Sequence, residues 1–279
     1  MSVVFHELEV SAVIVETPEC SSFELRVPAA LEEAFRYRAG QHLTLQLPWE
    51  QLKLTRCYSL SSCPDLGEAP KIAVKRVPGG RISNWLNDEL EAGDTVMASV
   101  PEGRFVLDPQ TRSGAPLFLF AAGSGITPII ALLKSALATT KRSITLLYAN
   151  QDADSVIYGA EVSRLAAENP GRLVVHFHFD STHGYLEQDD VRRLLHHCDI
   201  AEFYICGPEP FMELVEKTLE DAGVHEELVY IERFVSPADP ERVDDDSAAE
   251  ASLDSPDSFS LWLKGRSRTV PYVKGKTLL

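Results

Sequence analysis

The chain has few cysteines, a shortage of basic residues and no long apolar run. No two of its five cysteines have the C-x-x-C spacing of zinc or redox sites, and their odd number favours free thiols. We therefore expect neither a disulfide nor a metal centre. No apolar run is long enough to cross a bilayer, and Glu7 and Glu9 stand where a signal core would lie, so we expect a cytoplasmic protein.

Basic residues number 26 against 42 acidic ones, which gives a formal net charge of -16. Such a surface repels nucleic acids and anionic membranes, so we expect neither as a partner. Much of the charge lies in residues 236–258, together with Pro237, Pro240 and Pro256. This composition is typical of a solvated linker. An acidic docking site for a basic partner would have the same composition.

A length of 279 residues exceeds what one hydrophobic core usually organises, so two domains are expected. The first third alternates short apolar runs with turns, and one helix at 82–90 interrupts it. This pattern predicts a small antiparallel Greek-key barrel over residues 1–112. The expected strands lie at 8–16, 22–27, 42–47, 56–61, 71–76 and 95–100.

From Pro116 onward the pattern changes to strand followed by helix, which predicts a doubly wound parallel sheet over residues 113–235. Expected strands lie at 117–121, 144–148, 173–179, 203–206 and 229–232, and expected helices at 127–138, 159–168, 189–198 and 210–222. A ligand should lie at the carboxyl ends of the strands, near the topological switch. After the linker, 259–263 and 269–273 look like a hairpin, which we interpret as the start of a third domain at 259–279.

Arg56-Cys57-Tyr58-Ser59 contains the chemistry that a flavin needs: a cation for the pyrophosphate, a flat aromatic side chain for the ring and a hydroxyl near N5. The same four residues could form an ordinary barrel strand with a surface arginine. Downstream, the basic strand end Lys75-Arg76 precedes a glycine turn and Ser83, which we expect to open a helix. Amides at a helix N-terminus bind phosphate, so we place the FAD pyrophosphate here, although a plain capped helix is an alternative.

Gly123 and Gly125 follow the first strand of the βα region, where a dinucleotide phosphate would bind. We expect Thr127 to cap the next helix and Pro128 to occupy its first position. The segment departs from G-x-G-x-x-G, which indicates a nicotinamide-binding branch other than the usual dehydrogenases. Tyr148 to Asp152 end the second strand, and no arginine before Arg164 could hold a 2′-phosphate, so NADH is favoured over NADPH.

Cys206-Gly207-Pro208 ends the fourth strand, where Gly207 leaves room for the nicotinamide and the Cys206 thiol could lie beside its C4. A buried structural cysteine is the alternative. Glu232 and Phe234 close the last strand and could reach the flavin from the nicotinamide side, or Phe234 could be a core aromatic at a domain junction. The histidines offer no catalytic cluster, because His176 and His178 alternate within a strand and the pair at 196–197 lies in a helix.

With these residues the chain resembles the ferredoxin-NADP reductase superfamily and, within it, the reductase components of multicomponent oxygenases of the 3-ketosteroid 9α-hydroxylase and phenylacetyl-CoA epoxidase type. The likeness covers about residues 8–234. It is carried by the segments 56–60, 74–76, 83–86, 121–128, 146–150, 155–157, 206–208 and 211–212.

The resemblance implies FAD in the barrel, NADH in the α/β domain and a C-terminal ferredoxin with a 2Fe-2S cluster. Hydride would pass from NADH to FAD, and electrons would leave singly through the cluster to a terminal oxygenase. No cysteine follows Cys206, so the intact parent should hold the cluster and this chain, which stops before the ligands, should not. A stand-alone NAD(P)H-flavin or ferredoxin reductase, a non-catalytic FAD-binding regulatory module and a nucleic-acid-binding barrel are the alternative interpretations.

The candidate catalytic residues are Ser59, Cys206 and Glu232. The candidate cofactor-binding residues are Arg56, Cys57, Tyr58, Ser59, Val74, Lys75, Arg76, Gly80, Ile82, Ser83, Gly123, Gly125, Thr127, Pro128, Asn150, Asp152, Cys206, Gly207, Pro208 and Phe234.

Overall fold

The computed structural model describes residues 3–49, 52–107, 114–195, 201–234, 258–263 and 266–271. The chain divides into two compact units, Met1–Pro237 and Ala238–Leu279. In the second unit, β12 (Ser258–Leu263) pairs antiparallel with β13 (Arg266–Pro271). Pairing of Leu263 with Arg266 makes β13 begin earlier than the predicted range of 269–273. The predicted linker falls almost wholly outside the described residues.

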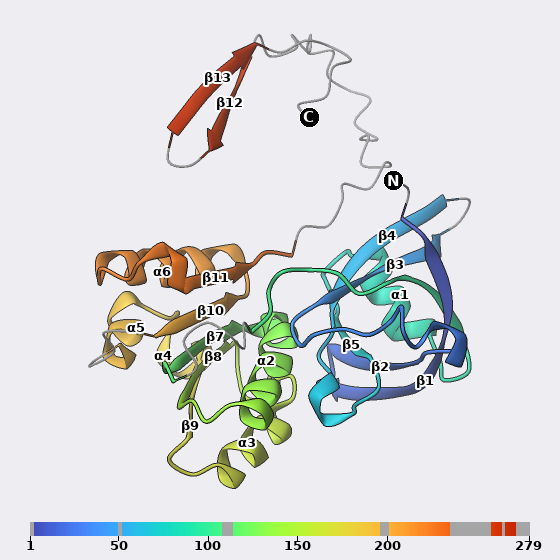
Figure 1. Ribbon diagram of the computed structural model, residues 1–279, viewed down its shortest axis with the longest axis horizontal. Helices are drawn as coiled ribbons and strands as arrows, with labels where there is room; N and C mark the ends of the chain where they lie inside the picture. Colours follow the sequence, from blue (N-terminus) through green and yellow to red (C-terminus); the bar gives the residue numbers. More distant parts are fainter. Residues whose placement is uncertain are drawn as a thin grey trace. The chain divides into compact units, whose positions relative to one another are not determined.

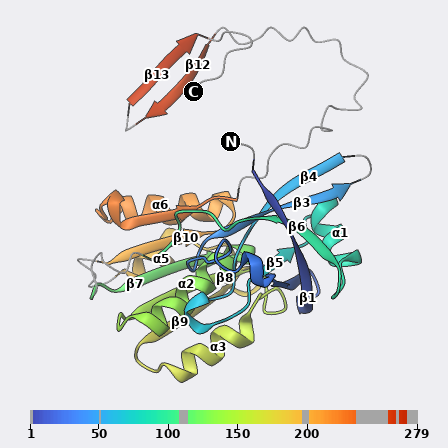
Figure 2. The ribbon, with the colours of Figure 1, turned by 45° about the vertical axis from the view of Figure 1, so that its right-hand side comes forward.

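The first sheet of the large unit has six antiparallel strands in the order β4-β3-β6-β1-β2-β5 (Figures 1 and 2). An isolated bridge from Leu60 to Ile72 joins the end of β4 to β5 and closes the sheet into a barrel. Alternate residues of β3 point inward, so Leu43, Leu45 and Leu47 are buried. The strands are β1 (Phe5–Thr17), β2 (Cys20–Arg26), β3 (His42–Trp49), β4 (Leu52–Ser59), β5 (Lys71–Lys75) and β6 (Thr95–Ser99), with short 3-10 turns η1 (Ala29–Leu31) and η2 (Pro64–Leu66).

Helix α1 (Arg81–Glu89) packs Ile82 and Leu86 into the barrel core and is its cap. This agrees with the predicted helix at 82–90. Its preceding turn contains Gly79 at φ +69, a conformation that favours glycine. The N-terminus of α1 is capped by no side chain.

The second sheet is parallel, with five strands in the order β11-β10-β7-β8-β9. The order reverses between β7 and β10, so their carboxyl ends flank the topological switch. The strands are β7 (Leu117–Ala122), β8 (Ile144–Asn150), β9 (Leu173–Phe179), β10 (Glu202–Cys206) and β11 (Val229–Glu232), and the predicted fold class is confirmed. The connecting elements are η3 (Gly123–Gly125), α2 (Ile126–Thr139), α3 (Gly159–Glu168), α4 (Asp180–His183), α5 (Gln188–Leu194), α6 (Glu209–Asp221) and η4 (Glu226–Leu228).

Helices cover both faces of this sheet, which explains why β7 is apolar along its whole length. Ile130 of α2 and Val162 of α3 share one core cluster with the sheet. Val191 of α5 and Val215 of α6 share a second cluster on the other face. Helix α2 also contacts η2 of the barrel, and it lies between barrel and sheet (Figures 1 and 2). Its residues 126–136 are all buried because it packs on both sides.

The barrel and the parallel sheet share apolar packing. Cys20, Ala73 and Phe105 of the barrel region belong to the same core cluster as α2. The Phe105 ring meets the Tyr204 ring edge-on, with centroids 5.4 Å apart. These contacts join the two sheets into one compact unit. No helix in the described part of the chain is long and apolar enough to cross a membrane.

A buried ion pair anchors the amino ends of the parallel strands. Arg142 Nη1 lies 2.6 Å from Glu202 Oε2, and the two side chains are 3% and 1% exposed. The Arg142 guanidinium also donates to the backbone oxygens of Ala115 and Pro116. The charge of Arg142 is therefore compensated by the carboxylate of Glu202, which begins β10, and by two carbonyl groups just before β7.

Candidate functional site

Ser59 and Glu232 meet although 173 positions separate them in the sequence. Ser59 ends β4 of the barrel and is 3% exposed, and Glu232 ends β11 of the parallel sheet. The Ser59 hydroxyl donates to Glu232 Oε2 at 3.5 Å. The structure therefore unites one residue predicted for the flavin side with one predicted for the nicotinamide side. On β4, burial raises the pKa of the half-buried Tyr58, so its phenol stays neutral.

Glu232 has a second partner that sequence reasoning missed, His42. His42 Nδ1 lies 3.7 Å from Glu232 Oε1, and His42 Nε2 lies 3.7 Å from Glu102 Oε1. Side-chain exposure rises along this row, from 13% for Glu232 to 23% for His42 and 58% for Glu102. The β3–β4 register places His42 opposite Ser59. The sequence could have indicated His42 only through strand pairing, because it stands at the start of the predicted strand 42–47 and pairs with Ser59.

The contact with Glu232 raises the pKa of His42 above its ordinary value, although partial burial opposes this shift. A histidine whose pKa is raised by folding contributes stability that is complete below pH about 6.5 and is lost as the pH rises through the folded pKa. We expect His42→Gln to lower the free energy of unfolding by about 0.5–1 kcal/mol at pH 5.5. The loss should shrink toward pH 8.

Urea denaturation at several pH values measures this difference. The matched control is His225→Gln, because His225 faces Glu227 at 3.8 Å but its side chain is 70% exposed. The control should change stability little at any pH. A destabilisation by His42→Gln that is equal at pH 5.5 and pH 8 would show that the charge of His42 is not what holds Glu232.

The two glycine motifs of the parallel sheet touch through their backbones. A Cβ at Gly125 would lie 2.1 Å from the carbonyl oxygen of Cys206 and 2.6 Å from the nitrogen of Gly207. A Cβ at Gly207 would in turn lie 3.0 Å from the Cβ of Ala122. Only glycine allows this approach, so the ends of β7 and β10 lie close together at the topological switch.

Cys206 lies at the end of β10 and is fully buried. Burial raises the pKa of its thiol well above the ordinary value, and the negative charge of Glu232 acts in the same direction. The thiol is therefore protonated near neutral pH. It can contribute packing and a weak S–H donor, but no thiolate.

The start of α2 differs from the prediction. The helix begins at Ile126, so Thr127 and Pro128 lie inside its first turn, and neither caps it nor opens it. The Thr127 hydroxyl donates back to the Ser124 oxygen at 3.0 Å. Gly123 has φ +52, and its carbonyl accepts a hydrogen bond from the Tyr148 hydroxyl at 3.2 Å. The turn at residues 123–125 is thus held by its own backbone and by the Tyr148 hydroxyl. The sequence places Tyr148 at the end of a strand but indicates no role for it in this turn.

Lys75 ends β5 next to the parallel sheet. A Cβ at Gly123 would lie 3.7 Å from Lys75 Nζ, so this ammonium lies over the first glycine loop. The Val74 and Ile82 side chains, by contrast, are 1% and 2% exposed and belong to the barrel core. Any contact of these two residues with a cofactor would therefore come from their backbone.

The turn before α1 also differs from the prediction. The helix begins at Arg81 with Gly80 as N-cap, so Ser83 does not open it. The Ser83 hydroxyl accepts a hydrogen bond from the Val77 amide at 3.1 Å and stabilises the turn. Arg76 pairs with Asp88 at 2.6 Å instead of projecting freely. The uncapped amides at the start of α1 remain the groups that could hold phosphate.

Asn150 ends β8 and is 5% exposed. Neither polar atom of its side chain makes a hydrogen bond of standard geometry with the described residues. Asp152 folds the following turn, because its Oδ1 accepts the Ser155 amide at 2.9 Å. The Asn150 side chain interacts with Tyr148 and keeps capacity for further hydrogen bonds, so it can receive a polar group of a ligand.

The remaining predicted residues lie nearer the surface. Arg56 donates to the Thr55 oxygen at 2.9 Å, and Cys57 is exposed. Pro208 is the N-cap of α6, and Phe234, just beyond β11, is 45% exposed. Among the described residues, no group of three or more His, Cys, Asp or Glu could hold a metal ion.

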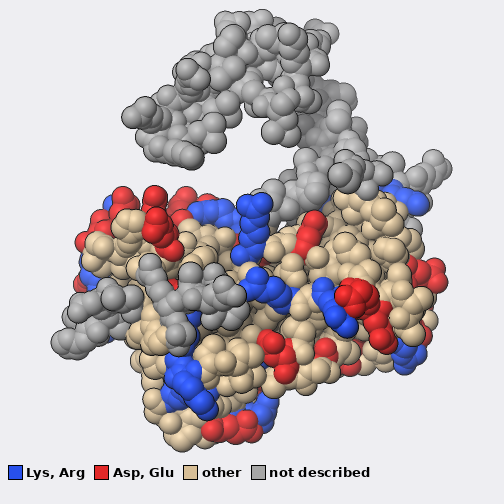
Figure 3. Space-filling view, viewed as in Figure 1, with Lys and Arg blue, Asp and Glu red and all other residues tan. Residues whose placement is uncertain are grey.

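Basic and acidic side chains are interspersed over the middle of the face in Figure 3. The charge of -16 belongs to the full chain, and several lysines and arginines are exposed on this face.

Comparisons with known proteins agree with this geometry. Residues 7–107 match the family described as "Oxidoreductase FAD-binding domain", and residues 119–217 match "Oxidoreductase NAD-binding domain". The chain is 39% identical to the ferredoxin reductase component of 3-ketosteroid-9-alpha-monooxygenase from Rhodococcus rhodochrous, over 88% of this chain and 71% of that protein. It is 33% identical to a component of the 1,2-phenylacetyl-CoA epoxidase from Escherichia coli, over 84% of this chain and 68% of that component.

Among solved structures, the CS-b5R domains of human Ncb5or in the NAD+ form superpose with a TM-score of 0.72. The two chains are 25% identical, and the match covers 83% of this chain and 70% of the other. The barrel and the parallel sheet together are thus a known arrangement.

Proposed function

Because the chain belongs to the FAD- and NAD-binding oxidoreductases of the ferredoxin-reductase type, we propose that it takes hydride from NADH and delivers electrons to a terminal oxygenase. It is an NADH-dependent flavoprotein oxidoreductase. The observation that carries the proposal is the contact of Ser59 with Glu232, since it joins the barrel to the carboxyl edge of the parallel sheet.

The residues present fit both dinucleotides. The uncapped start of α1 after Gly79 and Gly80 offers backbone amides to the pyrophosphate of FAD, and Lys75 adds a positive charge nearby. Tyr58 offers an aromatic surface on β4. For NADH, the contact of Gly125 with the Cys206–Gly207 peptide forms a backbone cradle that a Cβ would fill. The buried amide of Asn150, at the end of β8, can offer a hydrogen bond to a polar group of the nucleotide.

When bound, FAD would supply the conversion between two-electron and one-electron transfer. The chain's own residues would bind and orient the reactants. Glu232 would hold the Ser59 hydroxyl in one orientation and would place a negative charge beside the nicotinamide, which becomes positive as hydride leaves. Cys206, protonated and buried, would pack at the end of β10 without competing as a nucleophile.

For the acceptor we propose a terminal oxygenase reached through a 2Fe-2S ferredoxin. The names of the similar proteins support the oxygenase, because they are components of a ketosteroid monooxygenase and of a phenylacetyl-CoA epoxidase. The 2Fe-2S ferredoxin rests on the family resemblance alone. Of these two substrate classes we propose the steroid, since identity is 39% for the first protein and 33% for the second.

An anaerobic titration of the FAD-loaded chain with NADH and with NADPH tests the proposed function. We expect bleaching of the flavin absorption to be at least about tenfold faster with NADH, since Asp152 and Asp154 would repel a 2′-phosphate. The double variant Asp152→Asn with Asp154→Asn should reduce the ratio of the bleaching rate with NADH to the rate with NADPH. Bound flavin that neither nucleotide bleaches would refute the reductase and favour a binding module.

A further inference from the structure

Tyr158 has a backbone conformation that its surroundings must enforce. Immediately before α3 it has φ 58 and ψ 22, and among the described residues it is the one non-glycine at positive φ. For a bulky side chain this conformation is strained and persists only where tertiary contacts overdetermine it. Its side chain is 4% exposed. Buried contacts must therefore offset the strain.

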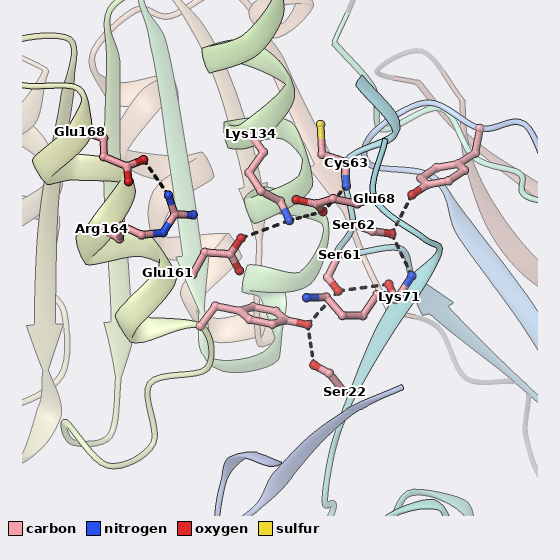
Figure 4. Close-up of polar contacts among 12 residues, drawn as sticks. Ser22, Ser61, Ser62, Cys63, Glu68, Lys71, Lys134, Glu161, Arg164 and Glu168 are labelled. Atoms are coloured by element: carbon pink, nitrogen blue, oxygen red, sulfur yellow. Dashed lines mark hydrogen bonds and ion pairs between the residues drawn. The ribbon is translucent and has the colours of Figure 1, made fainter. Parts of the chain in front are cut away.

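The hydroxyl of Tyr158 contacts the barrel, where its partners Ser22 and Ser61 are labelled in Figure 4. Its hydroxyl lies 2.8 Å from Ser22 Oγ on β2 and 2.8 Å from Ser61 Oγ just after β4. Both serines are fully buried, and Ser61 also donates to the Lys71 oxygen. Lys71 Nζ stands 5.3 Å from the centre of the Tyr158 ring. One phenol thus connects α3 to three barrel residues.

A second polar contact crosses the junction beside the first. Lys134 of α2, with a side chain 1% exposed, lies 2.6 Å from Glu68 Oε2 of the barrel and 3.3 Å from Glu161 Oε1 of α3. Glu68 Oε2 also accepts the Cys63 amide at 2.8 Å. Figure 4 shows Lys134 between these two carboxylates. The start of α3 is therefore held against the barrel at two points.

The segment that ends at Tyr158 begins at the end of β8, directly after Asn150. This segment, residues 151–158, includes Asp152 and lies at the carboxyl edge where the nucleotide is proposed to bind. Tyr148 fastens the same segment from within the sheet, because its one hydroxyl proton is shared between the Gly123 and Ile157 oxygens, each 3.2 Å away. The carboxyl end of this segment is thus held by the sheet at Ile157 and by the barrel at Tyr158.

We propose that Tyr158 is a positioning residue that holds the nucleotide segment 151–158 at a fixed place relative to the barrel. In this position, bound NADH would lie next to Ser59 at the end of β4. The inference rests on the proposed function, because it assigns Tyr158 to the hydride transfer between the two dinucleotides. It concerns the placement of NADH, and the retention of FAD should not depend on it.

Tyr158→Phe tests the proposal, because it removes the hydroxyl and keeps the ring. The KM for NADH should rise about tenfold, as expected when one buried hydrogen bond that orients the segment is lost. Hydride transfer at saturating NADH should slow about threefold to tenfold, because small misplacements of reacting groups are costly. The primary isotope effect with 4-deuterated NADH should grow, while the FAD content and the KM for an artificial acceptor stay constant.

Tyr37→Phe is the matched control. The Tyr37 hydroxyl lies 2.7 Å from Ser62 Oγ, so the same change removes a tyrosine–serine contact that stays within the barrel. This control should lose similar stability, with the KM for NADH and the isotope effect unchanged. Ser22→Ala and Ser61→Ala each remove one partner of the Tyr158 hydroxyl from the barrel side. If Tyr158→Phe fails to fold, these two variants test the proposal in its place.

Equal kinetics in Tyr158→Phe and Tyr37→Phe, or a Tyr158→Phe variant that loses only thermal stability, would overturn the positioning role. That result is distinct from failure of the proposed function, in which the wild-type chain with bound FAD is not reduced by NADH at all.

Discussion

Replacing Glu232 by glutamine is expected to slow hydride transfer from NADH about 100-fold at saturating nucleotide, with little change in NADH affinity. The side chain is 13% exposed, so its charge acts in a partly desolvated place where electrostatic effects are large. Glutamine keeps the shape and can still accept from Ser59, but it cannot stabilise the positive charge that develops on the nicotinamide. Stopped-flow reduction of the bound FAD measures the rate.

Glu102→Gln is the control for this prediction. Glu102 lies on the far side of His42 with a side chain that is 58% exposed, so its charge is screened by solvent. Its rate should stay within about twofold of the wild type. A rate for Glu232→Gln within about threefold of the wild type would contradict the proposed electrostatic role of this carboxylate. Ser59→Ala, which retains the charge, should have a smaller effect than Glu232→Gln.

Glu202→Ala is expected to lower the free energy of unfolding by about 3–5 kcal/mol, because it leaves the Arg142 charge buried without its carboxylate. Both partners are almost fully inaccessible, at 3% and 1% exposure, and their contact is 2.6 Å. Water cannot replace Glu202 without opening the amino ends of β7 and β10. Urea denaturation followed by circular dichroism measures the loss.

The contrast to this pair is Arg164 with Glu168, which are joined at the same 2.6 Å but are 55% and 53% exposed. Arg164→Ala should change the free energy of unfolding little, because solvent screens this exposed pair. The double variant Arg142→Met with Glu202→Leu should recover much of the stability lost in Glu202→Ala, since no unpaired charge remains. A loss below about 1 kcal/mol for Glu202→Ala would show that solvent reaches Arg142.

Several elements could be predicted from local pattern alone. Strand β9 and helix α3 have the predicted bounds, because β9 is a run of strand-forming residues and α3 has an amphipathic repeat. Strand β4 begins at Leu52, before the predicted 56, because β3 pairs with it as far as Trp49 opposite Leu52. Register between strands, more than propensity, determines where such a strand begins.

The predicted caps were wrong for a reason common to both helices. Ser83 and Thr127 have the residue type of an N-cap, yet α1 and α2 each begin directly after a glycine. A glycine turn brings backbone groups close enough that the hydroxyls bond within the turn, to the Val77 amide and the Ser124 oxygen. Residue type alone does not distinguish a capping hydroxyl from one that folds back on its loop.

His42, Tyr158 and Lys134 were missed because none of them belongs to a motif. Lys134 in particular lies within a predicted apolar helix, where a lysine is normally expected to reach solvent. Its partners Glu68 and Glu161 come from the barrel and from the next helix. No local pattern predicts such a pairing.

The sequence by itself determined the order of a barrel and a βα sheet, the two glycine motifs and the family to which they belong, since each depends on periodicity or spacing within a short segment. Only the tertiary structure decided that Ser59 meets Glu232 across 173 positions, that Gly125 packs on the Cys206–Gly207 peptide and that Tyr158 joins α3 to the barrel. Local propensities act over a few residues, whereas these contacts exist because packing of two sheets around α2 brings distant strand ends together.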